Sequence, residues 1–459
     1  MSTPISPERV LPTLNADGTR NRIRPRLYEG RLYRARRAVA YTLMALFIFL
    51  PRLRIHGKPV MLLDVLHRQF VLFGHTYLPT DGVLLMLLLL SIFVTIVLVT
   101  ALVGRAWCGW GCPQTVYMEF LFRPIERLFE GPREAQLRLD KAGLSGRRLA
   151  KNGVYLALSF LLANVFLAYF VGTDALEHWV LEAPSEHLGG FSVVLVTTGL
   201  VFFDFAYFRE QMCTVVCPYA RLQSVLLDPK SLLIGYDARR GEPRSKGKAK
   251  TAGHGDCIDC QACVVSCPTG IDIRQGLQLE CIACGQCADA CDSIMDRIKK
   301  PRGLIRYSSQ RALESGQTSS KLRVRVVIYA VVLAGLLASL LLIGRSRPSA
   351  EVTVLRGLGA PFSQNGDDVI NQLRLKVTNR GEKARDFSVQ ITDMPEARLI
   401  APELPLHVAP SEQASVSFFV VAPQGAVHGS RRIHLRVGDA SGGDLTTYTL
   451  LGPEGDAGP

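Results

Sequence analysis

Cys257-Ile-Asp-Cys260-Gln-Ala-Cys263-Val-Val-Ser-Cys267-Pro268 is the first of two cysteine-rich runs in this chain. The second run is Cys281-Ile-Ala-Cys284-Gly-Gln-Cys287-Ala-Asp-Ala-Cys291. Each has the C-x2-C-x2-C-x3-C spacing with which bacterial ferredoxins hold [4Fe-4S] clusters. Together they contain eight of the 12 cysteines among 459 residues. The proline that follows the first run is absent after the second, but proline shapes the turn and is not a ligand. The spacing predicts an electron carrier.

The expected ligands follow from how this spacing folds, because the fourth cysteine of each run binds the cluster of the other run. Structural zinc is a weaker interpretation, since zinc ligand pairs are usually a dozen or more residues apart. A disulfide framework would need an oxidising compartment. We therefore predict two [4Fe-4S] clusters, one on Cys257, Cys260, Cys263 and Cys291, and one on Cys281, Cys284, Cys287 and Cys267.

Composition indicates a membrane protein. Hydrophobic residues make up 48% of the chain, and the formal net charge is +13. The basic residues lie mostly beside long apolar runs, which favours membrane topology over nucleic-acid binding. A helix needs about 20 apolar residues to cross a bilayer. Five candidate spans are present: Ala38–Leu50, Val83–Val103, Val154–Val171, Phe191–Phe208 and Val326–Ile343. The first is short by itself and would have to extend back through the arginines that precede it.

Charge predicts the orientation and the order of domains. Residues 1–37 hold nine arginines, whereas residues 173–190 hold no arginine or lysine, so the first segment is expected inside and the second outside. The chain is therefore expected to be a multi-domain protein of the bacterial inner membrane with an α-helical transmembrane bundle. Its predicted parts are a basic cytoplasmic N-terminus (1–37), a region of four spans (38–218), a cytoplasmic ferredoxin domain (219–325), a fifth span (326–344) and a periplasmic domain (345–459).

The periplasmic domain is predicted to be an immunoglobulin-like β-sandwich. Four segments alternate apolar and polar residues, and Gly, Pro, Asn and Asp are common between them. The segment holds no cysteine and no evident catalytic cluster. An interaction module and a simple spacer both remain open for it.

The other four cysteines form two matched C-x3-C-P pairs, Cys108 and Cys112 before Pro113, and Cys213 and Cys217 before Pro218. Both pairs follow an apolar span and are expected at the inner membrane boundary. Residues i and i+4 share one face of a helix, and the following proline predicts a local break at the second cysteine. Four thiolates brought together would suit Cu(I), because soft sulfur ligands favour it.

Several uses of these pairs stay open. They could bind copper, with Met118 and Met212 adding thioether ligands, cycle between dithiol and disulfide, or meet a quinol. Buried cysteines that pack as small apolar side chains are the plainer interpretation. Asp204, on the fourth span, could be a proton or ion partner or simply reach the interface.

The motifs resemble those of the cytochrome c oxidase accessory proteins of the CcoG/FixG/RdxA type over nearly the whole chain. The resemblance rests on Gly104-Arg-Ala-Trp-Cys108-Gly-Trp-Gly-Cys112-Pro, on Cys213-Thr-Val-Val-Cys217-Pro-Tyr-Ala-Arg-Leu-Gln and on the ferredoxin runs. It implies a cupric reductase that makes Cu(I) for assembly of a cbb3-type cytochrome c oxidase, with Cys108, Cys112, Cys213 and Cys217 handling the copper.

The same resemblance implies the partners. These are the membrane, copper ions, copper chaperones or transporters, oxidase subunits, a cytoplasmic electron donor that the sequence does not name, and a second copy of the chain; nucleic acid is not expected. Two rival functions remain. One is a quinol-oxidising subunit that feeds a periplasmic reductase, and the other is a non-enzymatic scaffold for oxidase assembly.

Overall fold

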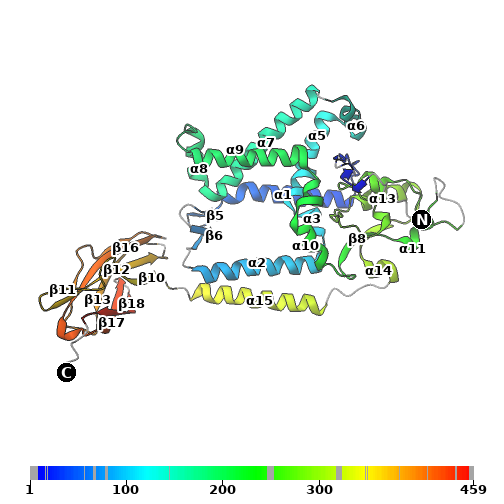
Figure 1. The fold of residues 1–459 in the computed structure, drawn as a ribbon. Helices are drawn as coiled ribbons and strands as arrows, with labels where there is room; N and C mark the ends of the chain where they lie inside the picture. Colours follow the sequence, from blue (N-terminus) through cyan, green and yellow to red (C-terminus); the bar gives the residue numbers. More distant parts are fainter. Residues whose placement is uncertain are drawn as a thin grey trace. The chain divides into compact units, whose positions relative to one another are not determined.

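The computed structural model of the protein describes residues 9–453 except positions 16, 18, 56, 66–68, 78–80, 144, 246–252, 317–322, 347, 349, 382, 411, 440 and 441. It divides into two compact units, Met1–Leu340 and Leu341–Pro459. The first holds the helical and cysteine-rich parts of the chain, and the second is built of strands (Figure 1). Each unit is described by itself.

Four described helices are long and apolar enough to cross a membrane: α2 (Gly82–Val103), α7 (Gly146–Val171), α9 (Leu188–Phe203) with its π-helical extension η4 (Asp204–Phe208), and α15 (Val324–Arg345). Side chains such as Leu89 and Leu200 are about two-thirds exposed on them, as expected of surfaces that face lipid. Four of the five predicted spans are therefore confirmed as candidates.

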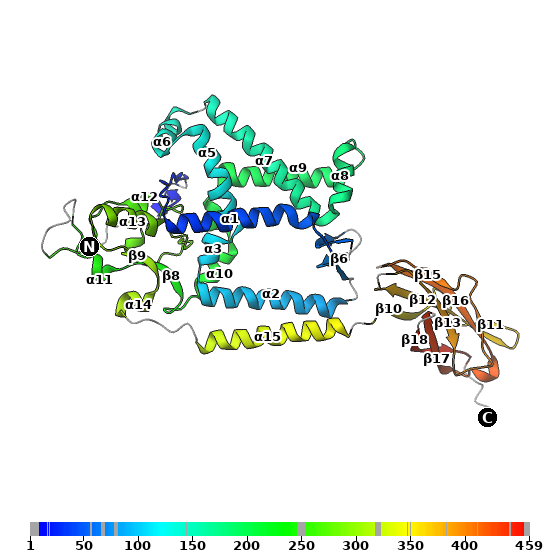
Figure 2. The same cartoon turned by 180° about the vertical axis from the view of Figure 1, so that it is seen from behind.

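The first predicted span lies in α1 (Arg31–Phe49), which has 19 residues but begins with a basic turn. It is not among the described helices that are apolar enough along their length. Both views show α1 roughly aligned with α2 and α9, whereas α7 runs obliquely to them (Figures 1 and 2). Helix α7 packs along α9.

Short helices follow α2 and α9. Gly104 ends α2 with a positive φ of 60°, and a Cβ there would come within 2.1 Å of the Leu232 carbonyl oxygen, so only glycine fits. The proline after each C-x3-C pair begins a new helix, because proline lacks the N–H that a first helical residue leaves unused. After α2 come α3 (Ala106–Trp110), α4 (Pro113–Tyr117), η3 (Met118–Phe122), α5 (Arg123–Glu130) and α6 (Arg133–Ala142); after η4 come η5 (Met212–Val216) and α10 (Pro218–Leu226).

The cysteine-rich elements form a small α/β arrangement beside α3 and α10 (Figure 2). Strands β8 (Leu232–Tyr236) and β9 (Ile305–Ser309) pair antiparallel. Helix α12 (Ala262–Val265) packs on α13 (Gln286–Arg297), and α13 also contacts α1. The smaller elements are β1 (Arg9–Leu11), β2 (Leu14–Asn15), α11 (Ala238–Gly241), η6 (Ile273–Gln275) and α14 (Gln310–Ser315).

At the other end of the helices, short strands and one helix connect the spans. Their bounds are η1 (Leu50–Arg52), β3 (Arg54–Ile55), β4 (Lys58–Pro59), β5 (Met61–Asp64), β6 (Gln69–Leu72), β7 (His75–Tyr77) and α8 (Thr173–Leu181).

Buried charges tie the N-terminal segment to α5 and α7. Glu126 pairs with Arg24 and, at 2.7 Å, with Arg209, while Lys151 lies 2.7 Å from Glu130. All five side chains are nearly inaccessible. Burial alone would raise the pKa of Glu126, but the Arg209 and Arg24 charges outweigh it and hold the pKa well below its ordinary value.

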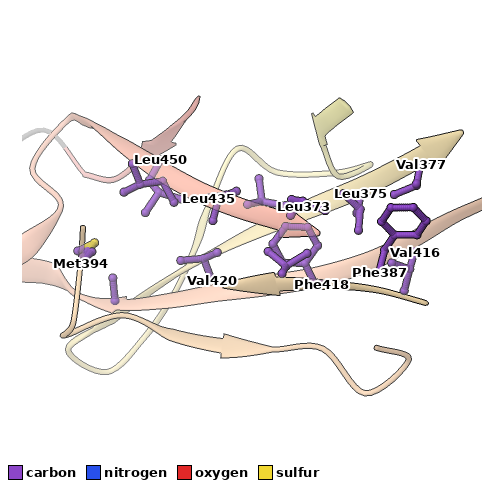
Figure 3. Close-up of a cluster of buried hydrophobic side chains, with 14 of the residues drawn as sticks. Leu373, Leu375, Val377, Phe387, Met394, Val416, Phe418, Val420, Leu435 and Leu450 are labelled. Atoms are coloured by element: carbon purple, nitrogen blue, oxygen red, sulfur yellow. The ribbon is translucent and has the colours of Figure 1, made fainter. Parts of the chain in front are cut away.

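The second unit is a β-sandwich, as predicted. One sheet has the order β10-β12-β16-β14 with β11 also paired to β12, and the other has the order β15-β13-β17-β18. Inward side chains from both sheets, including Phe387, Phe418 and Leu435, form its core (Figure 3). The bounds are β10 (Ala350–Arg356), β11 (Ser363–Asn365), β12 (Asp368–Asn379), β13 (Arg385–Ile391), β14 (Arg398–Ile400), β15 (Leu406–Val408), β16 (Gln413–Pro423), η7 (Gln424–Ala426), β17 (Ser430–Asp439) and β18 (Gly442–Leu451).

Candidate functional site

The first cysteine group combines a loop, α12 and α13. Cys257 and Cys260 precede α12, Cys263 lies on it, and Cys291 lies on α13. Burial raises the pKa of Cys291 to about 12, and the charges of Cys263, Cys257 and Cys260 add to that rise, so these four thiols are neighbours. Cys260 alone of the four is exposed. The chain thus brings the distant Cys291 to the first run.

The second cysteine group is more enclosed. Cys267, Cys281, Cys284 and Cys287 line one cavity together with apolar side chains. Burial raises the pKa of Cys281 to about 12, and Cys267 and Cys284 add to the rise. Cys263 of the first run also lines this cavity, together with apolar residues such as Ile234, Ile271 and Ile273.

These two groups fit iron–sulfur cubes better than single ions. Within the part of the chain that the structure describes, no three His, Cys, Asp or Glu side chains lie close enough to hold one metal ion. A cube carries its four thiolates on four separate irons, so its ligands stand farther apart than those around one ion. The second group also encloses a cavity, which a single ion would not require. The pairing of cysteines with clusters stays a prediction.

The first membrane pair straddles a helix break. Cys108 lies on α3, and Cys112 is extended, with φ −66° and ψ 127°, just before α4. The Cys108 thiol donates to Gln223 Oε1 at 3.2 Å. Burial raises the pKa of Cys108 to about 12, with a further rise from Cys112. Burial raises the pKa of Cys112 as well, and the backbone N–H groups of Gln114 and Thr115 oppose that rise.

The second pair repeats this arrangement on a π-turn. Cys213 lies in η5, and Cys217 is extended, with φ −63° and ψ 111°, before Pro218. The predicted break at the second cysteine is present in both pairs, because a residue before proline avoids the α region. The predicted α-helical face is present in neither pair: α3 ends at Trp110, before Cys112, and η5 is a π-turn.

The two pairs lie near each other. Burial raises the pKa of Cys213, and the charges of Cys112, Cys108 and Cys217 add to it, so all four thiols share one neighbourhood. They do not form a ready single-ion site among the described residues. Met118 is buried in an apolar cluster with Phe122, Tyr155 and Phe205. Its use as a thioether ligand stays a prediction. Asp204 accepts a hydrogen bond from Gln114 at 3.2 Å, which places it beside the α4 end of the first pair.

The membrane pair and the second cysteine group are in direct contact. A Cβ built on Gly109 would lie 2.7 Å from Cys284 Cα and 2.6 Å from the Ile282 carbonyl oxygen. The buried Arg36 donates through Nε to the Gly109 carbonyl oxygen at 2.8 Å. Arg105 donates to the carbonyl oxygens of Leu279, Cys281 and Ala220. The backbone between Cys108 and Cys112 therefore rests on the loop that carries Cys281 and Cys284.

A second connection joins α3 to the same loop through Tyr307. Trp110 Nε1 donates to the Tyr307 hydroxyl at 2.8 Å, and that hydroxyl donates to the Ala283 carbonyl oxygen at 2.6 Å. Four residues of this contact region were not predicted as site residues from the sequence: Gly109, Arg36, Arg105 and Gln223. Gly109 lies inside a motif that drew attention to its cysteines, and Arg36 counted only as one of many basic residues near the membrane.

Comparison with known proteins places these features in a family. The 4Fe-4S dicluster domain matches residues 208–310, a 4Fe-4S binding domain matches residues 85–132, and the IG-like fold at the C-terminal of FixG, a putative oxidoreductase, matches residues 340–453. Protein RdxA of Cereibacter sphaeroides is 34% identical, covering 92% of this chain and 94% of its own length. Nitrogen fixation protein FixG of Rhizobium meliloti is 33% identical, covering 88% and 87%. Putative electron transport protein YccM of Escherichia coli is 27% identical over 47% of this chain and 55% of its own.

Proposed function

We infer the function of this protein from its family, because the chain belongs to the FixG and RdxA family of membrane iron–sulfur proteins, and we propose that it reduces Cu(II) to Cu(I). Its coarser role as a membrane iron–sulfur electron-transfer protein follows from that membership, from the 4Fe-4S domains and from the four apolar helices. Copper as the substrate, and support of cbb3-type oxidase assembly, are the proposal.

The contact between Gly109 and Cys284 is the observation that carries the proposal. It joins the second cysteine group, in which Cys267 and Cys284 are buried, to the first membrane pair through packed backbone. Clusters bound to the two cysteine groups would supply one-electron redox chemistry. Cys108, Cys112, Cys213 and Cys217 would receive the copper ion as substrate.

The four thiols would favour the product over the substrate. Thiolates bind Cu(I) more readily than harder ligands do, so a Cu(II) ion that reaches them becomes easier to reduce. The surrounding burial keeps the pKa of Cys108 near 12, so copper must displace a proton when it binds. Because the four thiols do not already surround one point, we expect copper to engage one pair at a time or to draw the pairs together.

We propose the sidedness that the charge pattern predicts, with the cysteine groups in the cytoplasm and the sandwich in the periplasm. The reducing cytoplasm would protect free thiols. Copper would then bind to the thiols, and leave them, at the membrane boundary where α3 and η5 lie.

Reduction of Cu(II) by the reduced, cluster-loaded protein is the direct test. The protein is reduced without oxygen, the excess reductant is removed, and Cu(II) is added with a Cu(I)-specific chelator. We expect clusters to reoxidise with one Cu(I) formed per electron. Cys213→Ala with Cys217→Ala should stop Cu(I) formation while iron content stays unchanged. Clusters that remain reduced in the presence of Cu(II) would reject the copper function.

A cavity in the first unit favours quinol oxidation as a second candidate. It has a volume of about 440 Å³, is lined mostly by apolar side chains of α1, α7 and their neighbours, and reaches Tyr117. The Tyr117 hydroxyl is buried and has no hydrogen-bond partner among the residues that the structure describes. Reduction of the clusters by a quinol in sealed membranes, lost in Tyr117→Phe, would support this function in place of the first.

A further inference from the structure

We propose that Arg36 raises the reduction potential of the cluster that the second cysteine group would bind. Electrons would then leave from this group toward the membrane pairs. The first group, with its exposed Cys260, is then where electrons enter. This inference rests on the proposed electron path, but the potential of each group can be measured without copper.

Arg36 is a buried cation whose hydrogen-bonding capacity is only partly used. Its side chain is fully inaccessible, and only Nε has a described partner, the Gly109 carbonyl oxygen. Both terminal nitrogens are buried without a hydrogen-bond partner among the described residues. A buried guanidinium with unused donors is costly unless an acceptor faces it. The site therefore calls for an anionic partner.

The second cysteine group is the partner that the surroundings offer. Arg36 Nε donates to the Gly109 carbonyl oxygen at 2.8 Å, and the Gly109 backbone packs on Cys284, so the guanidinium lies near that thiol. Its charge opposes the rise that burial produces in the pKa of Cys284. On another side, the guanidinium lies 5.3 Å from the centre of the Phe120 ring, which helps to fix its position. Sulfur atoms bound in this group would give the terminal nitrogens the acceptors that they lack.

The first group has a cation too, but that cation is already neutralised. Arg274 pairs with Asp272 at 2.7 Å and with Asp259, and these carboxylates use its donors. A carboxylate, Glu119, also acts on Cys284, but it is paired with Arg123 at 2.9 Å. The first group thus lies beside a balanced charge set, whereas the second also lies beside Arg36, which has free donors.

This difference in charge between the two groups predicts the direction of electron transfer. A positive charge and N–H donors near the sulfurs make a cluster easier to reduce. One electron from a soluble carrier would enter at the exposed Cys260 side and settle on the second group, which is packed on Gly109. Each Cu(II) then takes one electron to become Cu(I), the carrier loses one electron, and no proton transfer is required.

The test is a redox titration of the full-length protein, loaded with both clusters and held in lipid nanodiscs without oxygen. Electron paramagnetic resonance follows the two clusters separately, and Cys260→Ser and Cys284→Ser show which signal belongs to which group. In Arg36→Gln we expect the second group to become at least tenfold harder to reduce, which is about 59 mV for one electron. The first group should keep its potential. Arg34→Gln removes the same charge from an exposed position of α1 and should change neither.

Arg36→Lys keeps the charge and loses the fork of donors, so its second group should shift less than that of Arg36→Gln. If Arg36→Gln does not hold its clusters, Arg36→Lys decides the question by the same comparison. Wild-type potentials in both variants, or equal shifts of both clusters, would overturn the assignment. A protein that shows the selective shift but never reduces Cu(II) would support the role of Arg36 and reject the copper function.

Discussion

Gly109 and Cys284 lie backbone against backbone, so closely that a Cβ on Gly109 would stand 2.7 Å from Cys284 Cα and 2.9 Å from its nitrogen. These residues are far apart in the sequence and belong to different predicted domains. Their contact means that the membrane pair and the ferredoxin elements form one packed region rather than two parts joined by a tether. Rigid packing fixes the distance that an electron has to cross.

Gly109→Ala should separate the two parts. The new methyl group meets backbone atoms of Ile282 and Cys284, which cannot move aside as a flexible side chain would. We expect reoxidation of the reduced protein by Cu(II) to slow by roughly tenfold or more, equivalent to about 1.4 kcal/mol in the barrier. Stopped-flow absorbance measures the rate, and iron analysis checks the clusters. Gly153→Ala on α7, where a Cβ meets nothing within 4 Å, is the matched control and should react at the wild-type rate.

The thiols of the protein without clusters should differ in reactivity according to their exposure. Cys260 is exposed and Cys284 is only 7% exposed. A brief treatment with an alkylating reagent, followed by mass spectrometry, should label Cys260 first because reaction requires access to the sulfur. Earlier labelling of Cys284 would show that the second group is open and would contradict its place as the enclosed group.

Glu126→Gln should destabilise the first unit strongly. The change removes the buried carboxylate that Arg24 and Arg209 share, and breaking a buried ion pair typically costs about 3–5 kcal/mol. Arg24 keeps Glu130 and Asp140, and Arg209 keeps Glu210, so we expect a loss at the lower end of that range. Thermal unfolding of the purified protein measures the loss, and Glu134→Gln on the exposed side of α6 should have little effect. Wild-type stability in Glu126→Gln would mean that the ion cluster is solvated.

The same carboxylate predicts a pH dependence. Because the folded-state pKa of Glu126 lies below its ordinary value of 4.5, its contribution is present above pH 4.5 and is lost as the pH falls through and below that value. The melting temperature of the wild-type protein should therefore fall more steeply below pH 4.5 than that of Glu126→Gln. Parallel curves would contradict this assignment.

Phe418→Ala should weaken the sandwich and leave the iron–sulfur part intact. Phe418 is fully buried in the core of the second unit, and such truncations cost about 3–5 kcal/mol. Calorimetry should show one transition moving down while iron content stays unchanged, because the two units are compact separately. Leu445→Ala, at a side chain that is 60% exposed, should move neither transition.

Several parts of this protein were predictable from the sequence, because each depends on residues that are close together in the chain. Cysteine spacing predicted two cluster-binding runs, and long apolar runs predicted four of the spans. Alternation of apolar and polar residues predicted the sandwich. The break after each C-x3-C pair was also predictable, because proline restricts the residue before it. Such features depend on neighbours in the chain and need no knowledge of the fold.

Only the tertiary structure decided which distant residues meet. It brought Cys291 to the first run, set Gly109 on Cys284, and placed Arg36 against the Gly109 carbonyl oxygen with two unused nitrogens. It also showed that the four membrane thiols are neighbours without surrounding one point. A glycine that permits close approach and an arginine that is buried with unused donors look ordinary in a sequence, because their role depends on what the folded chain packs against them.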